Sequence, residues 1–286
     1  MAQTPALRMA ATVMAAVTDE SIFVLLLRAA LFTPLMARNA LKSNVTWSSY
    51  PFLPPTSASG CLAELAGDGR WHEGNTIGLD ARRLQDIPEY REAFALGAYP
   101  SRSQLSRRHF RAHLGSIFNY EGTIWSAGRN EGKKLAVVEE TLADTITFVV
   151  VAHARKPLEV LHDAARGRLG PVAKKGSLEV LYSARPEIVE LRSAVASGNE
   201  ETLALMPVTE LGSLPERPLR PGETLVHHVP VRSRLRDGRI EWDIMPSTWQ
   251  EHLKFLAGVP IFAGITGDHG VGVSRAVWRR VRQVWS

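Results

Sequence analysis

The chain has 286 residues, and 45% of them are apolar, which is enough to bury a sizeable core in one elaborate domain or two small ones. Its formal net charge of +5 and pI near 9.5 give a modestly basic surface, which suits a polyanionic partner without requiring one. The single cysteine, Cys61, excludes an intramolecular disulfide and indicates a reducing compartment, so we expect a cytoplasmic protein.

The N-terminal third begins with an extension and a strand. The apolar run Met9–Val17 is too short and too weakly basic for a signal peptide, so we interpret residues 1–20 as a loosely ordered extension. The next segment, Ser21–Leu31, is almost continuously apolar, which predicts a strand buried on both faces and central in its sheet. Because Arg28 and Pro34 interrupt this region, it falls short of the ~20 residues that a membrane span needs.

A proline-rich extended segment runs into a helix between Ser48 and Gly67. Thr56 or Ser57 is the predicted N-cap of that helix. Free backbone N–H groups and the positive end of a helix dipole suit either a phosphate or a partner chain. Because Glu64 is the only ionised side chain in the segment, the segment carries no positive charge for a phosphate, and we interpret it as a brace of the fold and a partner contact, beside the basic loops that follow. The brace residues are Tyr50, Pro51, Phe52, Pro54, Pro55 and Thr56.

A cluster of basic residues follows a short predicted strand at Phe94–Tyr99. Ser101–Arg111 holds four arginines and a histidine with no acid, and aromatic residues follow it. Single-stranded RNA binding requires basic and aromatic residues together, since cationic side chains contact phosphates while aromatic rings or guanidinium planes stack on exposed bases. The alternative is a solvated basic loop whose aromatics belong to the core. The predicted RNA-binding residues here are Arg102, Arg107, Arg108, His109 and Arg111.

Two further strands are predicted at Leu135–Ala143 and Thr145–Ala152, after a charged, glycine-containing turn. Together with the segment that precedes this turn, they indicate a hairpin. Lys133 and Lys134 lie at its tip, where they either meet phosphate or remain solvated.

The apolar spacing in Pro157–Leu169 predicts a helix. Strand, helix, glycine-rich turn and strand then follow in order up to Leu181, which indicates a ferredoxin-like or RRM-type element. In the turn, backbone amides form an anion-binding nest beside two lysines. The spacing of a P-loop is absent, so we reject a nucleoside triphosphatase. The predicted RNA-binding residues of this turn are Lys174, Lys175, Gly176 and Ser177.

The C-terminal region begins after a proline-rich connector at 214–221. Thr224–Val231 and Arg239–Met245 flank an Asp-Gly pair, which predicts a hairpin. We interpret the glycine-rich stretch 264–272 as a turn. Val273–Trp285 is predicted to be an amphipathic basic helix that either docks on its own domain or meets RNA or a partner.

We predict neither a metal site nor a catalytic site. His227 and His228 point to opposite faces of a regular strand, and no histidine pair has a convincing metal spacing. RNA cleavage without metal needs a base, a proton donor and a cation, for which Tyr120, His109 and Lys133 are available. No local motif links these three residues, so we expect no catalysis and no cofactor.

One segment also carries a family resemblance. The sequence from Tyr50 to Thr56, followed by a helix of small residues, resembles the signature near the N-terminus of the fifth Cas protein family of type I CRISPR systems. Phe23–Ala29 resembles that family's first strand, and Leu31–Pro34 and Gly170–Ser177 fit its further pattern. The resemblance spans roughly Ser21–Leu181 and is absent from the last hundred or so residues.

The resemblance implies an α+β fold. A ferredoxin-like or RRM-type domain at 21–182 would carry a β-hairpin thumb insertion around 101–145. A variable, β-rich C-terminal region at 183–286, with a hairpin and a helix, would pack on that domain.

The resemblance also implies a function. The protein would be a non-catalytic subunit of a type I CRISPR Cascade surveillance complex, capping the 5′ handle of the crRNA for RNA-guided DNA targeting. Its partners would be the crRNA, the backbone subunit, the large subunit and, indirectly, target DNA, with no membrane. One branch of the family processes precursor crRNA as a metal-independent endoribonuclease, which is one alternative. A structural adaptor that contacts only proteins is the other.

Overall fold

The structure is a computed structural model that describes residues 20–283 except 36, 39–45, 48, 68–82, 101–106, 117–132, 173–175, 184, 213–225, 237–238 and 251. Its helices are α2 (Pro55–Leu65), α3 (Arg155–Ala165) and α4 (Arg275–Arg282), with short 3-10 turns η2 (Leu84–Asp86), η3 (Pro88–Tyr90) and η4 (Val208–Glu210). None of the described helices has the length and apolar character that a membrane crossing requires.

Six elements form a ferredoxin-like unit. In chain order these are β1 (Ser21–Leu31), α2, β5 (Phe94–Pro100), β8 (Thr145–Ala152), α3 and β10 (Gly176–Val180). In space the strands lie in the order β10-β1-β8-β5, and every neighbouring pair is antiparallel. Two interleaved β-α-β units produce this order. The α+β fold with a ferredoxin-like unit, as predicted, is therefore confirmed.

The two helices cover one face of this sheet. The buried apolar residues of α3, Leu158, Leu161 and Ala165, lie in the helix that contacts β1 and β8, and Leu62 and Leu65 of α2 are buried in the same core. β1 lies between β8 and β10, so the prediction of a central, buried strand at Ser21–Leu31 is confirmed.

Two predictions about helix ends are wrong. The helix α2 begins at Pro55 with Pro54 as its N-cap residue, so neither Thr56 nor Ser57 is the cap. Proline at the first helical position needs no N–H partner and has a helical φ, which favours this earlier start. The helix α3 spans Arg155–Ala165 instead of Pro157–Leu169, because proline is tolerated within the first turn.

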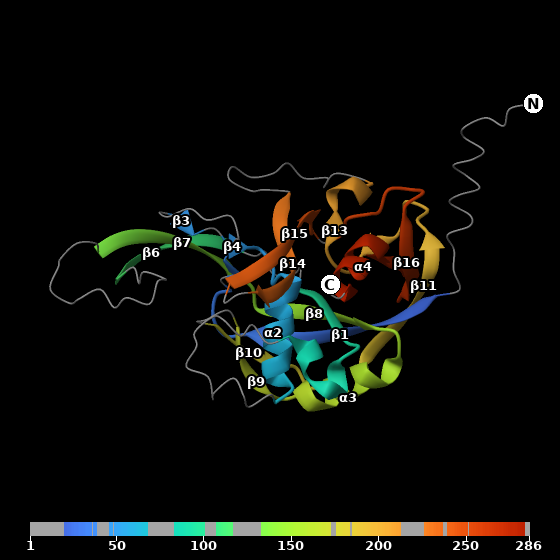
Figure 1. Cartoon of the computed structure of the whole chain (residues 1–286), viewed down its shortest axis with the longest axis horizontal. Helices are drawn as coiled ribbons and strands as arrows, with labels where there is room; N and C mark the ends of the chain where they lie inside the picture. The colour runs from blue at the N-terminus through green and yellow to red at the C-terminus, as the bar shows by residue number, and fades with distance from the viewer. Residues whose placement is uncertain are drawn as a thin grey trace, which may run out of the picture.

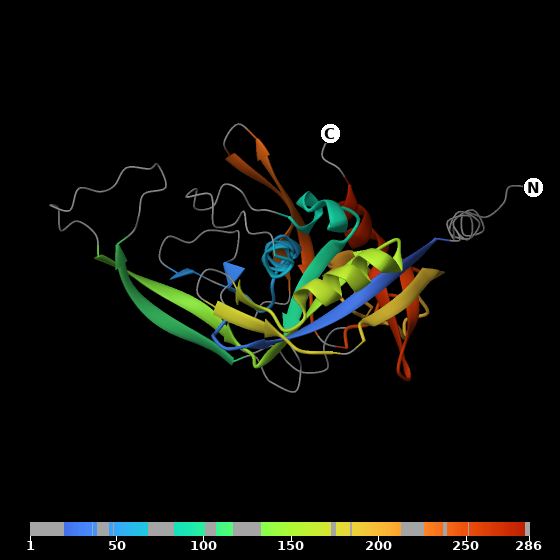
Figure 2. The same cartoon turned by 90° about the horizontal axis from the view of Figure 1, so that it is seen from below.

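The C-terminal strands extend the same sheet. β11 (Glu187–Val195) pairs with the first half of β1, from Ser21↔Arg192 to Leu26↔Glu187, whereas β10 pairs with its last residues. β16 (Pro260–Thr266), β17 (His269–Ser274) and the short β12 (Glu201–Thr202) continue outward from β11. Figure 2 shows β1 running beneath α3 toward these strands. One strand thus belongs to both halves of the chain.

A separate hairpin packs against α2 and α4. β14 (His227–Arg236) and β15 (Arg239–Thr248) pair on either side of the Asp-Gly pair, as predicted for a hairpin, and β13 (Met206–Pro207) pairs with β15. The helix α4 lies beside this hairpin, with Trp278 1% exposed and its ring 5.4 Å from that of Phe94. A C-terminal helix docked on its own domain, the first of the two predicted alternatives, is therefore what the structure shows.

The insertion between β5 and β8 forms a long hairpin. β6 (Arg107–Ser116) and β7 (Lys133–Leu142) are antiparallel over ten residue pairs, and Figure 1 shows them projecting from the body of the molecule. β3 (Thr46–Trp47) pairs with β7, β2 (Ala37–Arg38) pairs with β4 (Ser49–Tyr50), and β9 (Leu169–Val172) pairs with β10. The hairpin is attached to the body at its base.

Candidate nucleic-acid interface

The projecting hairpin carries most of the predicted RNA-binding residues. Arg107, Arg108, His109 and Arg111 belong to β6, and their register partners on β7 run from Leu142 back along the strand. Lys133 and Lys134 pair with Ser116 and Gly115 at the far end. Nine residue steps separate Arg107 from Ser116, which corresponds to about 30 Å of strand. The basic positions thus follow the hairpin from base to tip.

The glycine-rich turn emerges near the base of that hairpin. Gly176 and Ser177 open β10 and pair with Val172 and Pro171. Leu178 pairs with Leu31 at the end of β1, and the Leu31 N–H donates to the Asp144 carbonyl, at 2.7 Å, just before β8. Because β10 and β8 flank β1, these two strands begin at the same end of the sheet about 10 Å apart.

Three of the predicted positions lie outside the described residues. These are Arg102, before β6, and the two lysines of the turn, Lys174 and Lys175. The RNA contacts of all the predicted residues, inside and outside the described part, stay predictions.

Exposed apolar and aromatic residues lie near the two ends of β10 and were not predicted as a site. Phe32 is 58% exposed, Tyr182 is 74% exposed, and Leu181 donates its N–H to the Arg28 carbonyl at the margin of the sheet. The side chain of Arg28 is 66% exposed and lies 3.4 Å from Glu187. The sequence signal for this surface is Arg28 within an otherwise apolar strand, which we used against a membrane span and in the family resemblance but not as a site residue.

The brace segment is part of an aromatic cluster. The ring of Phe52 lies 5.6 Å from both Tyr99 of β5 and His227 of β14, and Tyr99 stacks on Trp249 at 4.7 Å. The Tyr50 hydroxyl donates to the His228 carbonyl at 2.5 Å.

The same segment is bonded to the ferredoxin-like sheet. The Leu53 N–H donates to the Ala98 carbonyl at 2.8 Å, and the Ala98 N–H donates back at 3.0 Å. Tyr50, Phe52, Leu53 and Pro55 are buried. The segment therefore joins the sheet to the β14–β15 hairpin, and its contact with a partner stays a prediction.

No metal or catalytic arrangement emerges within the described part of the chain. There, no group of three or more histidines, cysteines or carboxylates is placed to hold a metal ion. Of the three residues considered for RNA cleavage, Tyr120 lies outside the described residues, and His109 and Lys133 lie near opposite ends of β6 and β7. The expected absence of catalysis stays a prediction.

Comparison with known proteins gives limited information. No protein-family model and no curated protein matches the chain. Among solved structures, a chain in a cryo-EM structure of the Type III-B Cmr-beta complex bound to cognate target RNA and AMPPnP is similar, with 10% identity and a TM-score of 0.39. The match covers 82% of this chain and 86% of that chain. A second structure, of Cmr-beta bound to cognate target RNA, has the same identity and coverage and a TM-score of 0.35. Such low scores carry no argument about this protein.

Proposed function

We propose that the protein is a non-catalytic RNA-binding subunit of a type I CRISPR surveillance complex that holds the 5′ handle of the guide RNA. The observation that carries the proposal is the projecting β6–β7 hairpin, whose basic positions run from base to tip. The strand β10, which follows the two lysines of the second predicted RNA-binding segment, begins at the same end of the sheet. The family resemblance of the Tyr50–Thr56 segment supplies the specific role.

The physical basis of the proposed RNA binding is electrostatic. Arginines and lysines that neutralise phosphates release counterions, so affinity falls steeply with salt. A hairpin that reaches away from the body presents these basic positions along an extended strand of RNA, although Glu140 and Glu139 of β7 lie opposite His109 and Phe110. The histidine and the aromatic residues of the insertion are suited to stack on unpaired bases.

A binding assay tests this proposal. Changing Arg107, Arg108, Lys174 and Lys175 together to alanine should weaken binding of a crRNA handle at least tenfold and flatten the salt dependence, by about 0.7 in the log-log slope for each lost phosphate contact. The control changes four exposed basic residues elsewhere, Arg155, Lys156, Arg185 and Arg192, to alanine. Equal affinities for the two variants would remove the proposed RNA surface.

The two alternative functions have their own signatures. An endoribonuclease would convert repeat RNA to a cut product in the presence of EDTA, whereas the proposed subunit leaves the RNA intact. A protein-only adaptor would bind RNA weakly and without a steep salt slope.

A further inference from the structure

One part of the ferredoxin-like sheet exposes apolar side chains on the face away from α2 and α3. In Figure 2 both helices lie above β1. Residues opposite each other in antiparallel strands share a face, so Leu169, Glu179 and Ala30 lie on one face across β9, β10 and β1. Leu169 is 70% exposed, whereas Ala29 and Val180, on the opposite face, are 0% and 1% exposed. We call the face of Leu169, over β9, β10 and the second half of β1, the open face.

The centre of the open face consists of four neighbouring positions on β1 and at the end of β10. Ala30 lies opposite Glu179, and the Leu181 N–H donates to the Arg28 carbonyl at 2.9 Å. Diagonal neighbours in such a pair of strands are about 7 to 8 Å apart. One diagonal therefore joins two opposite charges, Arg28 and Glu179, and the other joins two apolar residues, Ala30 and Leu181. Leu181 is 41% exposed, and Phe32, just beyond the end of β1, is 58% exposed.

The charges of the open face do not suit RNA. Among the described positions in register on this face, the charged residues are Arg28, Glu179 and Glu187, which is one cation against two carboxylates. Such a balance repels phosphates, whereas exposed apolar side chains grouped together are typical of protein contacts.

Both charges of the central diagonal are available to a partner. The Arg28 side chain is 66% exposed, and only its Nη2 lies near Glu187, at 3.4 Å, so its other guanidinium nitrogens remain accessible. Glu179 is exposed and forms no ion pair with any residue that the structure describes.

We propose that the open face binds the open face of a second copy of this chain in a twofold-symmetric dimer. In such an interface a contact between two residues occurs twice, with the copies exchanged. A twofold axis along the diagonal of Ala30 and Leu181 places Arg28 of each copy against Glu179 of the other, and packs Leu181 on its own counterpart. Two ion pairs then lie on either side of an apolar centre. The proposal goes beyond the RNA-binding function proposed above and does not depend on it.

Sedimentation velocity of the whole protein without RNA tests the dimer. The protein should be a monomer at about 1 μM and mostly a dimer at about 100 μM, since a small interface gives micromolar affinity. A protein that stays monomeric at the higher concentration would overturn the proposal.

Exchange of the two charges tests the arrangement. Glu179→Arg alone, or Arg28→Glu alone, should raise the dissociation constant of the dimer at least about tenfold, because each change creates two like-charge contacts across the axis. The two changes together should return it to within about threefold of the parent value, because the exchanged charges pair again. Both positions are exposed, so the variants should fold, which circular dichroism verifies. No recovery in the combined variant would overturn the proposal.

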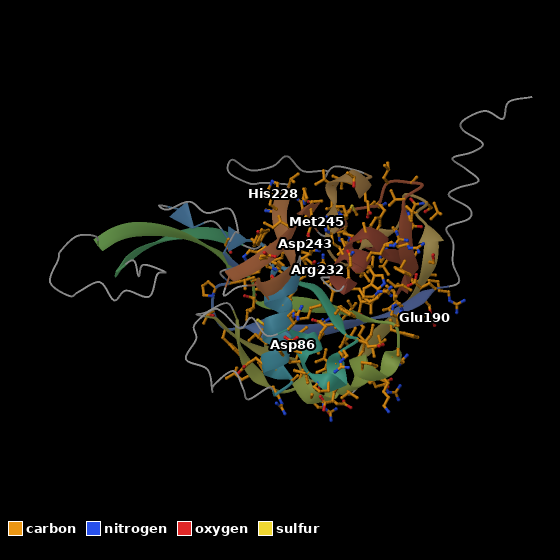
Figure 3. The ribbon with its side chains drawn as sticks, in the orientation of Figure 1. Asp86, Glu190, His228, Arg232, Asp243 and Met245 are labelled. Carbon is orange, nitrogen blue, oxygen red and sulfur yellow. The ribbon has the colours of Figure 1, made fainter. Side chains whose placement is uncertain are left out.

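A matched control makes the same charge reversal at a distance. Glu190 is exposed on β11, and Figure 3 shows it at the far end of the sheet from β9 and β10. Glu190→Arg should change the dissociation constant less than about twofold. An effect as large as that of Glu179→Arg would mean that dimerisation responds to net charge alone, against the proposal.

RNA is the rival occupant of the open face. Leu181→Asp places a carboxylate at the apolar centre, so it should prevent dimerisation up to about 100 μM while handle-RNA affinity stays within about twofold of the parent. Dimerisation that survives this change would overturn the proposal. A drop in RNA affinity, in a protein that is monomeric with or without the change, would assign the face to RNA instead.

Discussion

Tyr99 shows how one hydroxyl joins the two halves of the chain. It is 3% exposed, it donates to the Leu96 carbonyl at 2.7 Å, and it accepts from the Leu205 N–H at 2.9 Å. Burial raises the pKa of the Tyr99 phenol, and the hydrogen bond from Leu205 lowers it. The hydroxyl therefore stays neutral and keeps both hydrogen bonds, one as a donor and one as an acceptor. Its ring stacks on Trp249, so the polar and apolar contacts between β5 and the C-terminal region coincide at one residue.

Glu210 gives a pH-dependent prediction. Burial raises the pKa of its carboxyl, a hydrogen bond from Ser274 lowers it, and Oε2 has no hydrogen-bond partner within the described residues. Because the folded-state pKa lies above the unfolded value, the folded state holds the proton more tightly. Stability from this group is fully present below the unfolded-state pKa and is lost as the pH rises through the folded-state pKa.

Glu210→Gln should therefore match the parent protein in acid and become the more stable of the two as the pH approaches neutrality. Urea unfolding at a series of pH values measures the difference. The exposed Glu92→Gln serves as the control, with stability expected within about 0.5 kcal/mol of the parent protein. A Glu210→Gln difference that stays constant between acid and neutral pH would contradict the assignment.

The four arginines that gather near the start of α2 mark the limit of prediction from sequence at this scale. The sequence placed no positive charge at the start of α2, and we assigned phosphate binding to other loops. Arg83, Arg91, Arg232 and Arg282 come from distant parts of the chain, and only long-range packing brings them to Thr56. Local sequence patterns carry no information about contacts between residues so far apart in the chain.

At the scale of elements, local patterns predicted strands better than helix ends. The continuous apolar run at Ser21–Leu31 was sufficient for β1, and the Asp-Gly pair was sufficient for the β14–β15 hairpin. Helix boundaries depended on tolerance of proline in a first turn, which the sequence does not settle. The pairing of β11 with β1 was missed, because register between strands so far apart is set by the whole core.

The hairpin insertion is predicted to be separable from the fold. Pro100 pairs with Ile146 in the β5–β8 ladder, so the two ends of the insertion are adjacent and a short Gly-Ser turn can replace residues 102–143. The shortened protein should keep its fold, with a melting temperature within a few degrees of the parent, and should lose at least about tenfold in affinity for handle RNA. Circular dichroism and fluorescence anisotropy measure the two quantities.

The control for this deletion keeps the hairpin and changes its far end. Lys133→Gln with Lys134→Gln should reduce affinity less than the deletion does, since the basic positions of β6 remain. Undiminished RNA binding by the shortened protein would show that the hairpin is not the RNA-binding element.

At the scale of the whole molecule, the sequence boundary near residue 182 does not separate two independent cores. β1 pairs with β8, β10 and β11, and the larger of two buried apolar clusters among the described residues extends from Ile22 to Trp278 and includes both halves, whereas a smaller cluster around Phe255 lies in the C-terminal half. When one half of the chain unfolds, the strands of the other half lose the strands with which they pair. The two halves should therefore unfold together.

Equilibrium urea unfolding tests this coupling. Tryptophan fluorescence, which includes the signals of Trp249 and Trp278 in the C-terminal half, and far-UV circular dichroism of the whole chain should give coincident transitions. Trp278→Ala should lower the stability by about 3 to 5 kcal/mol, because it opens a cavity beside Phe94, and should shift both transitions equally. A fluorescence transition that precedes the circular dichroism transition would show that the C-terminal half unfolds independently. In that case the β1–β11 pairing would not be sufficient to make the sheet a single cooperative unit.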